Sequence, residues 1–213
     1  MAITQDDVVR TAVRLLDEVG LEGLTLRRLG CELGVSAPTL YWHVRDKRAL
    51  LDLVAEAITA EPASPVRPAH GQPWWEWLSE GAWRQYRALI SHRDAALVVA
   101  GNRPTQTSLP VIEQLIATLV EVGFPPRDAL ESIFTVGHFV LGAALERQAE
   151  AARGAATEAD AAMAIRLRDA EELPHLTGAL HSGCALDSES TFRYGLALIV
   201  AGLRARHAEL VDL

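Results

Sequence analysis

The chain has 213 residues, 49% of them hydrophobic and 23% charged, and a formal net charge of −8. This composition is typical of a folded protein with one or two domains, and we expect no membrane helix because no run of about 18 uncharged apolar residues occurs. Two cysteines, Cys31 and Cys184, are too few and too far apart for a disulfide framework or a metal site. Asp6 and Asp7 interrupt the amino-terminal segment, so no secretory signal is expected and the compartment predicted is the cytoplasm.

The charges are distributed unevenly along the chain. Residues 1–50 hold seven basic and seven acidic side chains, whereas residues 51–213 carry the whole excess of negative charge. Within the first segment, residues 26–48 have five basic side chains against two acidic ones. A basic island on an acidic chain is typical of a phosphate-binding head joined to a separate sensing domain.

Four helices are predicted before residue 60, because apolar residues recur there at helical spacing and small polar residues stand where helices begin. Serine, threonine and aspartate cap the first turn of a helix, and glycine is common where a helix ends. The predicted helices are a first from Val8 to Val19, capped by Thr4 and stopped by Gly20; a second after Thr25 that ends at Gly34; a third from Ser36 to His43; and a fourth capped by Asp46.

A proline-rich loop over residues 61–73 separates this part of the chain from the rest. Beyond the loop most segments again have helical periodicity, apart from a turn at 101–110 and an irregular stretch at 154–187 with a partial helix near 161–172. We therefore predict an all-α fold with two domains, residues 1–60 and residues 61–213. The helices predicted in the second domain are 74–91, 94–100, 109–122, 127–152 and 188–207.

The second and third predicted helices form a candidate helix-turn-helix with its turn at Gly34. The outer side of the third helix would be free to enter a major groove of DNA, with nearby cations on phosphates. An ordinary helical hairpin inside a bundle would show the same spacing, but the outward aromatic residues and the basic run at 45–48 favour DNA binding. The apolar residues spaced to pin the two helices together are Leu29, Leu33, Val35 and Leu40.

The chain closely resembles the tetracycline repressor (TetR) family on five segments that occur in one order: Pro38–Asp52, Ser91–Asp94, Arg103–Pro104, Val136–Phe139 and Leu145–Glu146. The resemblance implies a helix-turn-helix DNA-binding domain followed by a larger helical domain that binds an effector and dimerises. We accordingly expect three partners: a double-stranded DNA operator, a small-molecule effector and a second copy of the chain. Neither a cofactor nor a metal nor a membrane is expected.

The resemblance also implies which side chains contact DNA. Arg27 is similar to a base-reading arginine, and a bidentate arginine–guanine pair is the commonest specific contact. Ala37 stands where a base-reading amide is usual and Leu26 where a polar residue would reach the backbone, so the operator is expected to be related but not identical. Trp42 is expected to pack under the third helix and is left out of the set. The predicted DNA-binding residues are Arg27, Ala37, Pro38, Thr39, Tyr41, His43 and Lys47.

For the effector, the resemblance implies a pocket in the second domain. Val99 stands where the tetracycline branch of the family has the histidine that coordinates drug-bound magnesium, and valine cannot bind a metal. We therefore expect a largely apolar, aromatic effector that needs no magnesium. His138 and Glu146, eight residues apart on one predicted helix, share a face and could orient it. The predicted effector-binding residues are Trp77, Gln85, Val99, Asn102, His138 and Glu146.

Dimerisation is expected through the last helix and the long helix at 127–152. Both carry small residues, among them Gly195 and Gly202, that allow helices to approach closely in a bundle shared by two subunits. The alternative is that these residues serve packing within one chain.

Three functions remain open from the sequence. The first is a repressor that an effector releases from its operator, and the second is a DNA-binding regulator without an effector, whose own tryptophans fill the pocket. The third is an enzyme that uses His138 and Glu146 as acid and base, which we disfavour because no nucleophile, metal cluster or phosphate loop accompanies them.

Overall fold

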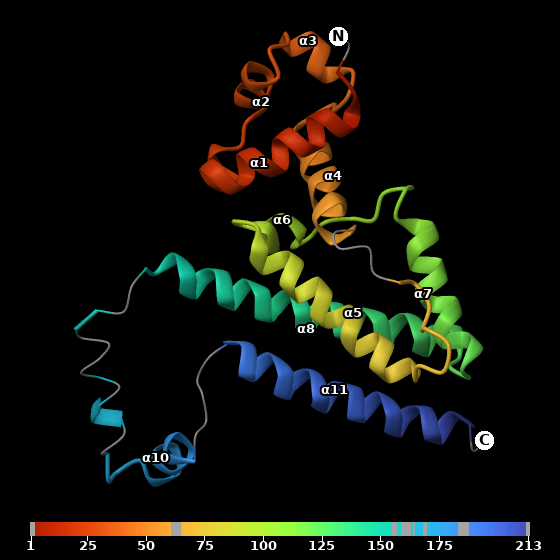
Figure 1. Ribbon diagram of the computed structural model, residues 1–213, viewed down its shortest axis with the longest axis vertical. Helices are drawn as coiled ribbons and strands as arrows, with labels where there is room; N and C mark the ends of the chain where they lie inside the picture. The colour runs from red at the N-terminus through yellow and green to blue at the C-terminus, as the bar shows by residue number, and fades with distance from the viewer. Residues whose placement is uncertain are drawn as a thin grey trace.

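The computed structural model describes residues 3–60, 65–154, 157–158, 163, 165–167, 170–182 and 188–211, and these are helices joined by turns and loops. Two groups of helices are visible in Figure 1. We call α1–α4 the head and α5–α11 the body, and the division into domains at residue 60 remains a proposal. The helices are α1 (Gln5–Gly23), α2 (Leu26–Glu32), α3 (Ala37–Tyr41), α4 (Lys47–Ala60), α5 (Trp74–Ser91), α6 (Ala95–Val99), α7 (Leu109–Glu121), α8 (Pro126–Ala152), α10 (Pro174–His181) and α11 (Ser188–Val211).

Two of the three predicted caps, Thr4 and Asp46, are confirmed, and Thr25, after which the second helix was predicted to begin, also acts as a cap. Thr4 and Asp7 form a capping box at the start of α1, in which the Thr4 hydroxyl accepts from the Asp7 amide at 3.2 Å. The hydroxyl of Thr25 accepts from the Arg28 amide at 3.1 Å, and a carboxylate oxygen of Asp46 accepts from the Ala49 amide at 2.7 Å. These bonds satisfy amide groups that the first turn of a helix leaves without partners.

Two signals at helix ends act differently from the prediction. Ser36 makes no side-chain cap for α3, because its hydroxyl bonds the Thr39 hydroxyl at 2.9 Å instead of a backbone amide. At Gly20 α1 kinks through a backbone with φ +73° and ψ 176°, and one further turn carries it to Gly23. That conformation is essentially restricted to glycine, so Gly20 bends the helix rather than ending it.

All four helices of the head contribute to its core, and α4 also packs against α5 and α6 of the body. Each of the four contributes side chains with at most 2% of their surface exposed, and α1 packs on both α2 and α4. Burial of this kind removes apolar surface from water at about 25 cal/mol per Å². The residues are Val8, Leu15, Leu16, Leu29, Leu40, Leu50, Val54 and Ile58.

In the body, α5, α8 and α11 lie alongside one another, and α7 packs on α8 (Figure 1). Tyr86 of α5 stacks on Phe192 of α11 with ring centroids 4.1 Å apart, which ties the first and last helices of the body together. The predicted bounds of α5 are confirmed, and α7 and α8 agree with prediction to within one residue. By length and composition alone α8 could cross a membrane, which is weak evidence because packed core helices pass the same test.

Other boundaries were predicted less well. The third helix ends at Tyr41 instead of His43, and the last helix continues to Val211, four residues past the predicted end. The stretch 154–187, predicted to be irregular, contains α10. Of the partial helix predicted near 161–172, residues 163 and 165–167 are helical and residues 170–172 are not, while the other five residues and Cys184 lie outside the described residues.

Candidate functional site

The end of the head opposite the body presents α2 and α3. Gly34 makes the turn between them with φ +65°, and the Val35 amide closes it by donating to the Gly30 carbonyl at 3.0 Å. A left-handed residue favours glycine because it has no Cβ to clash. Leu29 and Leu40 are buried beneath the two helices, while the partly buried Leu33 and Val35 pack against the same core. The predicted pinning of the helix-turn-helix is confirmed, and α3 is held outward.

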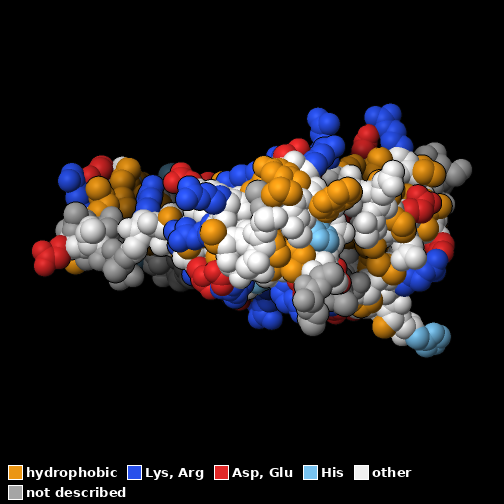
Figure 2. Space-filling view, turned by 90° about the horizontal axis from the view of Figure 1, so that it is seen from above, with side chains coloured by type: hydrophobic (Ala, Val, Ile, Leu, Met, Phe, Trp, Pro, Cys, Tyr) orange, Lys and Arg blue, Asp and Glu red, His pale blue; other side chains and the backbone are white. Residues whose placement is uncertain are grey.

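The outward face of α3 carries side chains of the predicted DNA set. Pro38, Thr39 and Tyr41 are exposed, as is Arg27 on α2, whereas His43 is only partly exposed. Ala37 is the first residue of α3. Viewed from this end, basic and apolar side chains lie next to one another on the surface (Figure 2). Such a mixed surface can bind phosphates and contact base edges.

Trp42 was predicted wrongly. Its side chain is 89% exposed, not packed under α3. The interior at this turn is filled by Leu40 and Val44, each 2% exposed, and a residue midway between two such positions points the other way on a helical turn. The i, i+4 spacing of Leu40 and Val44 could have shown this from the sequence.

One cation of the head is neutralised within the head itself. Arg14 donates to Glu18 at 2.6 Å and to Glu32 at 2.5 Å. Hydrogen bonds to Glu32 and then Glu18 raise the pKa of Arg14 above its usual value. Arg45, by contrast, is 83% exposed and makes one 3.3 Å ion pair with its neighbour Asp46, so it is better placed than Arg14 to meet phosphate.

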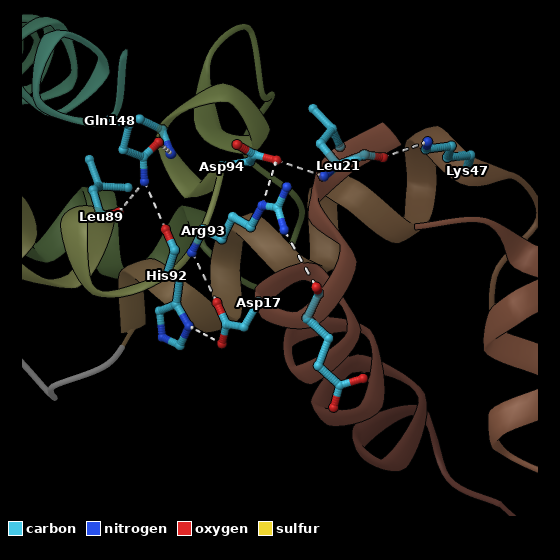
Figure 3. A network of polar contacts seen from close by, with 10 residues as sticks. Asp17, Leu21, Lys47, Leu89, His92, Arg93, Asp94 and Gln148 are labelled. Atoms are coloured by element: carbon cyan, nitrogen blue, oxygen red, sulfur yellow. Dashed lines mark hydrogen bonds and ion pairs between the residues drawn. The ribbon is translucent and has the colours of Figure 1, made fainter. Parts of the chain in front are cut away.

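Lys47, predicted to contact DNA, lies at the start of α4 where the head meets the body (Figure 3). Its ammonium group donates to the Leu21 carbonyl at 3.1 Å, while the Leu21 amide donates to Asp94 of the body at 2.8 Å. Nearby, Asp17 of α1 bonds the His92 ring at 2.9 Å and the Arg93 amide at 3.0 Å. The head is thus attached to the body by a network of polar contacts, which we call the junction.

A hollow of about 550 Å³ opens on the body between α8 and the start of α11. His138 and Glu146 both line it, so the prediction that they share one face is confirmed. Phe139 and Phe192 also line it and stack with ring centroids 5.3 Å apart. Planar rings beside an imidazole and a carboxylate could hold a flat aromatic molecule and orient its polar groups.

The other four predicted effector residues lie elsewhere in the body. Trp77 is buried and its indole donates to the Pro65 carbonyl at 2.7 Å, and the half-buried Val99 packs against the core. Gln85 is half-buried on α5. The buried Oδ1 atom of Asn102 has no hydrogen-bond partner among the described residues. The structure therefore groups two of the six residues at the hollow, and the effector set remains a proposal.

Phe192, which lines the hollow and stacks on Tyr86, was missed as a candidate. Their stack depends on α5 and α11 meeting across about a hundred residues of sequence, which no local spacing reveals. The hydroxyl of Tyr86 is buried and, within the described part of the chain, makes no hydrogen bond. Among those residues, no three His, Cys, Asp or Glu side chains gather as metal ligands would.

Known protein families and relatives match nearly the whole chain. Residues 8–54 match the family model of the bacterial regulatory proteins, tetR family, and residues 67–207 match that of the tetracyclin repressor-like, C-terminal domain. The tetracycline repressor protein class D of Escherichia coli is 37% identical over 211 residues, which cover 99% of this chain and 94% of the relative.

Two solved structures show the same architecture. ActR of Streptomyces coelicolor in complex with actinorhodin is 31% identical with a TM-score of 0.82, covering 97% of this chain and 99% of that one. TetR(class A) in complex with 5a,6-anhydrotetracycline and magnesium is 35% identical with a TM-score of 0.69, covering 93% and 96%.

Proposed function

The chain belongs to the tetracycline repressor family of DNA-binding transcriptional regulators, and on this premise we propose that it is a homodimeric repressor released from its operator by a small, largely apolar effector. The observation that carries the proposal is an outward α3, held by Leu29 and Leu40, on a head attached to a body with an aromatic-lined hollow. Such a regulator acts in the cytoplasm, where the DNA is, and no catalytic role is assigned to His138 or Glu146.

For DNA reading, the exposed residues support the roles that the family resemblance implies. The resemblance implies that Arg27 reads a guanine and that Pro38 and Tyr41 pack on thymine methyl groups, and all three are exposed. It also implies that Thr39, whose hydroxyl bonds the Ser36 hydroxyl at 2.9 Å, contacts a phosphate. We add Trp42 to the set, because an indole 89% exposed beside Tyr41 is positioned to contact the sugar–phosphate backbone. Ala37, His43 and Lys47 complete the proposed interface.

For assembly, the outer face of α8 and α11 is proposed to meet the same face of a second copy. Tyr194 and Leu198 of α11 are 69% and 57% exposed, and Phe134 of α8 is 49% exposed, which is a large apolar surface for one chain. A Cβ added to Gly202 would meet nothing within 4 Å, whereas one at Gly195 would come within 2.5 Å of the Phe139 ring. Gly195 therefore serves packing within the chain, and Gly202 is left for the partner.

For the effector, the relatives bind compounds of two kinds, actinorhodin in one structure and anhydrotetracycline with magnesium in the other. The aliphatic Val99 and the stacked Phe139 and Phe192 favour an aromatic compound held without a metal. Trp74 and Trp77, both at most 5% exposed, instead support the alternative regulator whose interior is filled by its own side chains.

A titration of operator complexes separates these possibilities. A duplex selected from a random library by the purified protein would be labelled, and actinorhodin or 5a,6-anhydrotetracycline would be added with and without a chelator. We expect actinorhodin to release the DNA equally well in both conditions. Release only by anhydrotetracycline, and only with magnesium, would contradict the argument from Val99, and the alternative regulator would stay bound throughout.

A variant locates the effector site. His138→Ala should weaken actinorhodin binding while leaving operator affinity unchanged, because His138 lines the hollow and not the head. His175→Ala is the matched control, since His175 is an exposed histidine on α10. Equal effects of the two substitutions would show that the hollow is not the effector site.

A further inference from the structure

Gln148 of α8 makes three hydrogen bonds to the backbone of one corner of the body (Figure 3). Its amide nitrogen donates to the Leu89 carbonyl at 2.8 Å and to the His92 carbonyl at 2.7 Å, and its oxygen accepts from the Ala96 amide at 3.1 Å. The two carbonyls lie at the end of α5 and the amide in the first turn of α6, where helices leave backbone groups without internal partners. One side chain therefore joins α8 to the connection between α5 and α6.

The residue between those contacts has an unusual backbone. Asp94 has φ +56°, the one positive φ among the described residues other than glycine. Such a conformation persists when surrounding contacts determine it strongly. Gln148 supplies those contacts from both sides, because it binds residue 92 before Asp94 and residue 96 after it.

Asp94 and its neighbours hold the head. The Asp94 carboxylate accepts from the Leu21 amide at 2.8 Å, and the Arg93 guanidinium donates to the Glu18 carbonyl at 3.4 Å. Leu21 in turn accepts from Lys47 at the start of α4. A hydrogen-bonded chain thus runs from α8 through the corner to α1 and α4.

The same turn of α8 borders the hollow. Glu146, Ala149 and Glu150 line the hollow, while Gln148 between them binds the corner on the other side of the helix. A displacement or rotation of this turn would therefore change both surfaces together.

We propose that Gln148 is the positioning residue through which α8 sets the conformation of Asp94 and, through it, the orientation of the head. With its three bonds intact, the corner holds α1 and α4 in the arrangement that reads DNA. When a ligand in the hollow shifts α8, these bonds weaken, Asp94 loses its support and the Leu21 contact is released. The inference rests on the proposed function and adds the contact that couples its two sites.

The test compares Gln148→Leu, which keeps the bulk and removes every polar atom, with Arg147→Leu. Arg147 is the exposed neighbour, whose ion pair is with Glu150 at 3.5 Å. Hydrogen exchange of the Leu21 amide is the first readout, because that amide bonds Asp94 and does not touch Gln148. Gln148→Leu should speed its exchange by about 2- to 30-fold, the range of measured couplings, and Arg147→Leu should leave it unchanged. An unchanged Leu21 amide beside a faster Ala96 amide would overturn the proposal, because Gln148 would then be only a local cap.

The second readout is a double-mutant cycle with Asp94→Ala on affinity for the selected duplex. If Gln148 acts through Asp94, the double variant should bind the duplex only slightly more weakly than whichever single variant has the lower affinity. If the two single losses of DNA affinity instead multiply in the double variant, the proposal is overturned.

Gln148→Glu, which keeps the side-chain length, replaces Gln148→Leu if that variant does not fold. Should the wild-type protein select no duplex, the proposed function fails, but the exchange of the Leu21 amide still tests the coupling.

Discussion

The head and the body bury their apolar side chains to different extents. In the head, all four helices meet in one core, and residues such as Leu16, Leu29 and Leu50 have no exposed surface. In the body, α11 contributes only Phe192, Leu196 and Val200 to the buried set, while Tyr194 and Leu198 stay exposed. The helices of the head are covered by one another and by α5 and α6 of the body, whereas α11 of the body leaves large apolar side chains exposed.

Exposed aromatic residues therefore suit different partners in the head and in the body. In the head, Tyr41 and Trp42 lie beside the exposed Arg45, and apolar contact combined with positive charge suits DNA. In the body, the guanidinium of Arg193 beside Tyr194 lies 4.1 Å from the centre of the Trp83 ring and pairs with Glu189 at 3.0 Å. The apolar face of α11 is left for helix packing.

The largest effect should follow from a charge on the face of α11. Leu198→Glu would bury an unpaired carboxylate between two subunits at a cost of about 3–5 kcal/mol, which should give monomers that no longer hold the operator. Light scattering and DNA titration measure both. Val111→Glu on α7, at a position 47% exposed, is the control and should stay dimeric. A dimeric Leu198→Glu protein would show that the interface lies elsewhere.

A smaller effect, a loss of stability, is expected where the head contacts the body. A Cβ at Gly20 would lie 2.7 Å from the Asp94 carboxylate and would need a φ of +73°. Gly20→Ala should therefore lower the free energy of unfolding by more than the roughly 1–3 kcal/mol of backbone strain alone. Gly34→Ala, with φ +65° and nothing within 4 Å of the added Cβ, is the control for a positive-φ glycine without a close contact. Equal losses in urea unfolding would mean that the junction does not depend on close approach.

Within the head, replacing Arg27 and replacing Lys47 should weaken DNA binding in two different ways. Arg27→Ala should weaken operator binding by about 1–3 kcal/mol and relax specificity at one base pair, because a base contact is lost. Lys47→Ala should weaken binding to all sequences alike and reduce the salt slope by about one. Affinities for a set of single-base operator variants at several salt concentrations separate the two. A uniform loss for Arg27→Ala would show that it does not read a base.

The smallest effect concerns the first helix of the head. The Thr4 hydroxyl, and after it the Thr4 amide, hold the pKa of the Asp7 carboxyl below its ordinary value of 3.8. A lowered pKa stabilises the folded chain above the unfolded value, and this contribution is lost as the pH falls through the folded value. The difference in stability between wild type and Asp7→Asn should thus shrink as the pH falls below about 4. A difference that is constant with pH would mean that the carboxylate charge does not matter to the cap.

Much of the head could be predicted because its signals are local. The caps at Thr4, Thr25 and Asp46 each join groups three residues apart, so a short stretch of sequence contains both partners. The helix-turn-helix needed only the apolar spacing around Gly34. Trp42 was missed because its position was assigned without the burial of its neighbours Leu40 and Val44.

The body depends on contacts that no short window contains. Sequence alone placed α5, α7 and α8 and put His138 and Glu146 on one face, because helical periodicity determines the direction of each side chain. Only the tertiary structure decided that Gly195 meets Phe139, that Phe192 stacks on Tyr86, and that Gln148 binds the corner before α6. These contacts join segments roughly fifty to a hundred residues apart, and they are set by how whole helices cross rather than by the residues along any one of them.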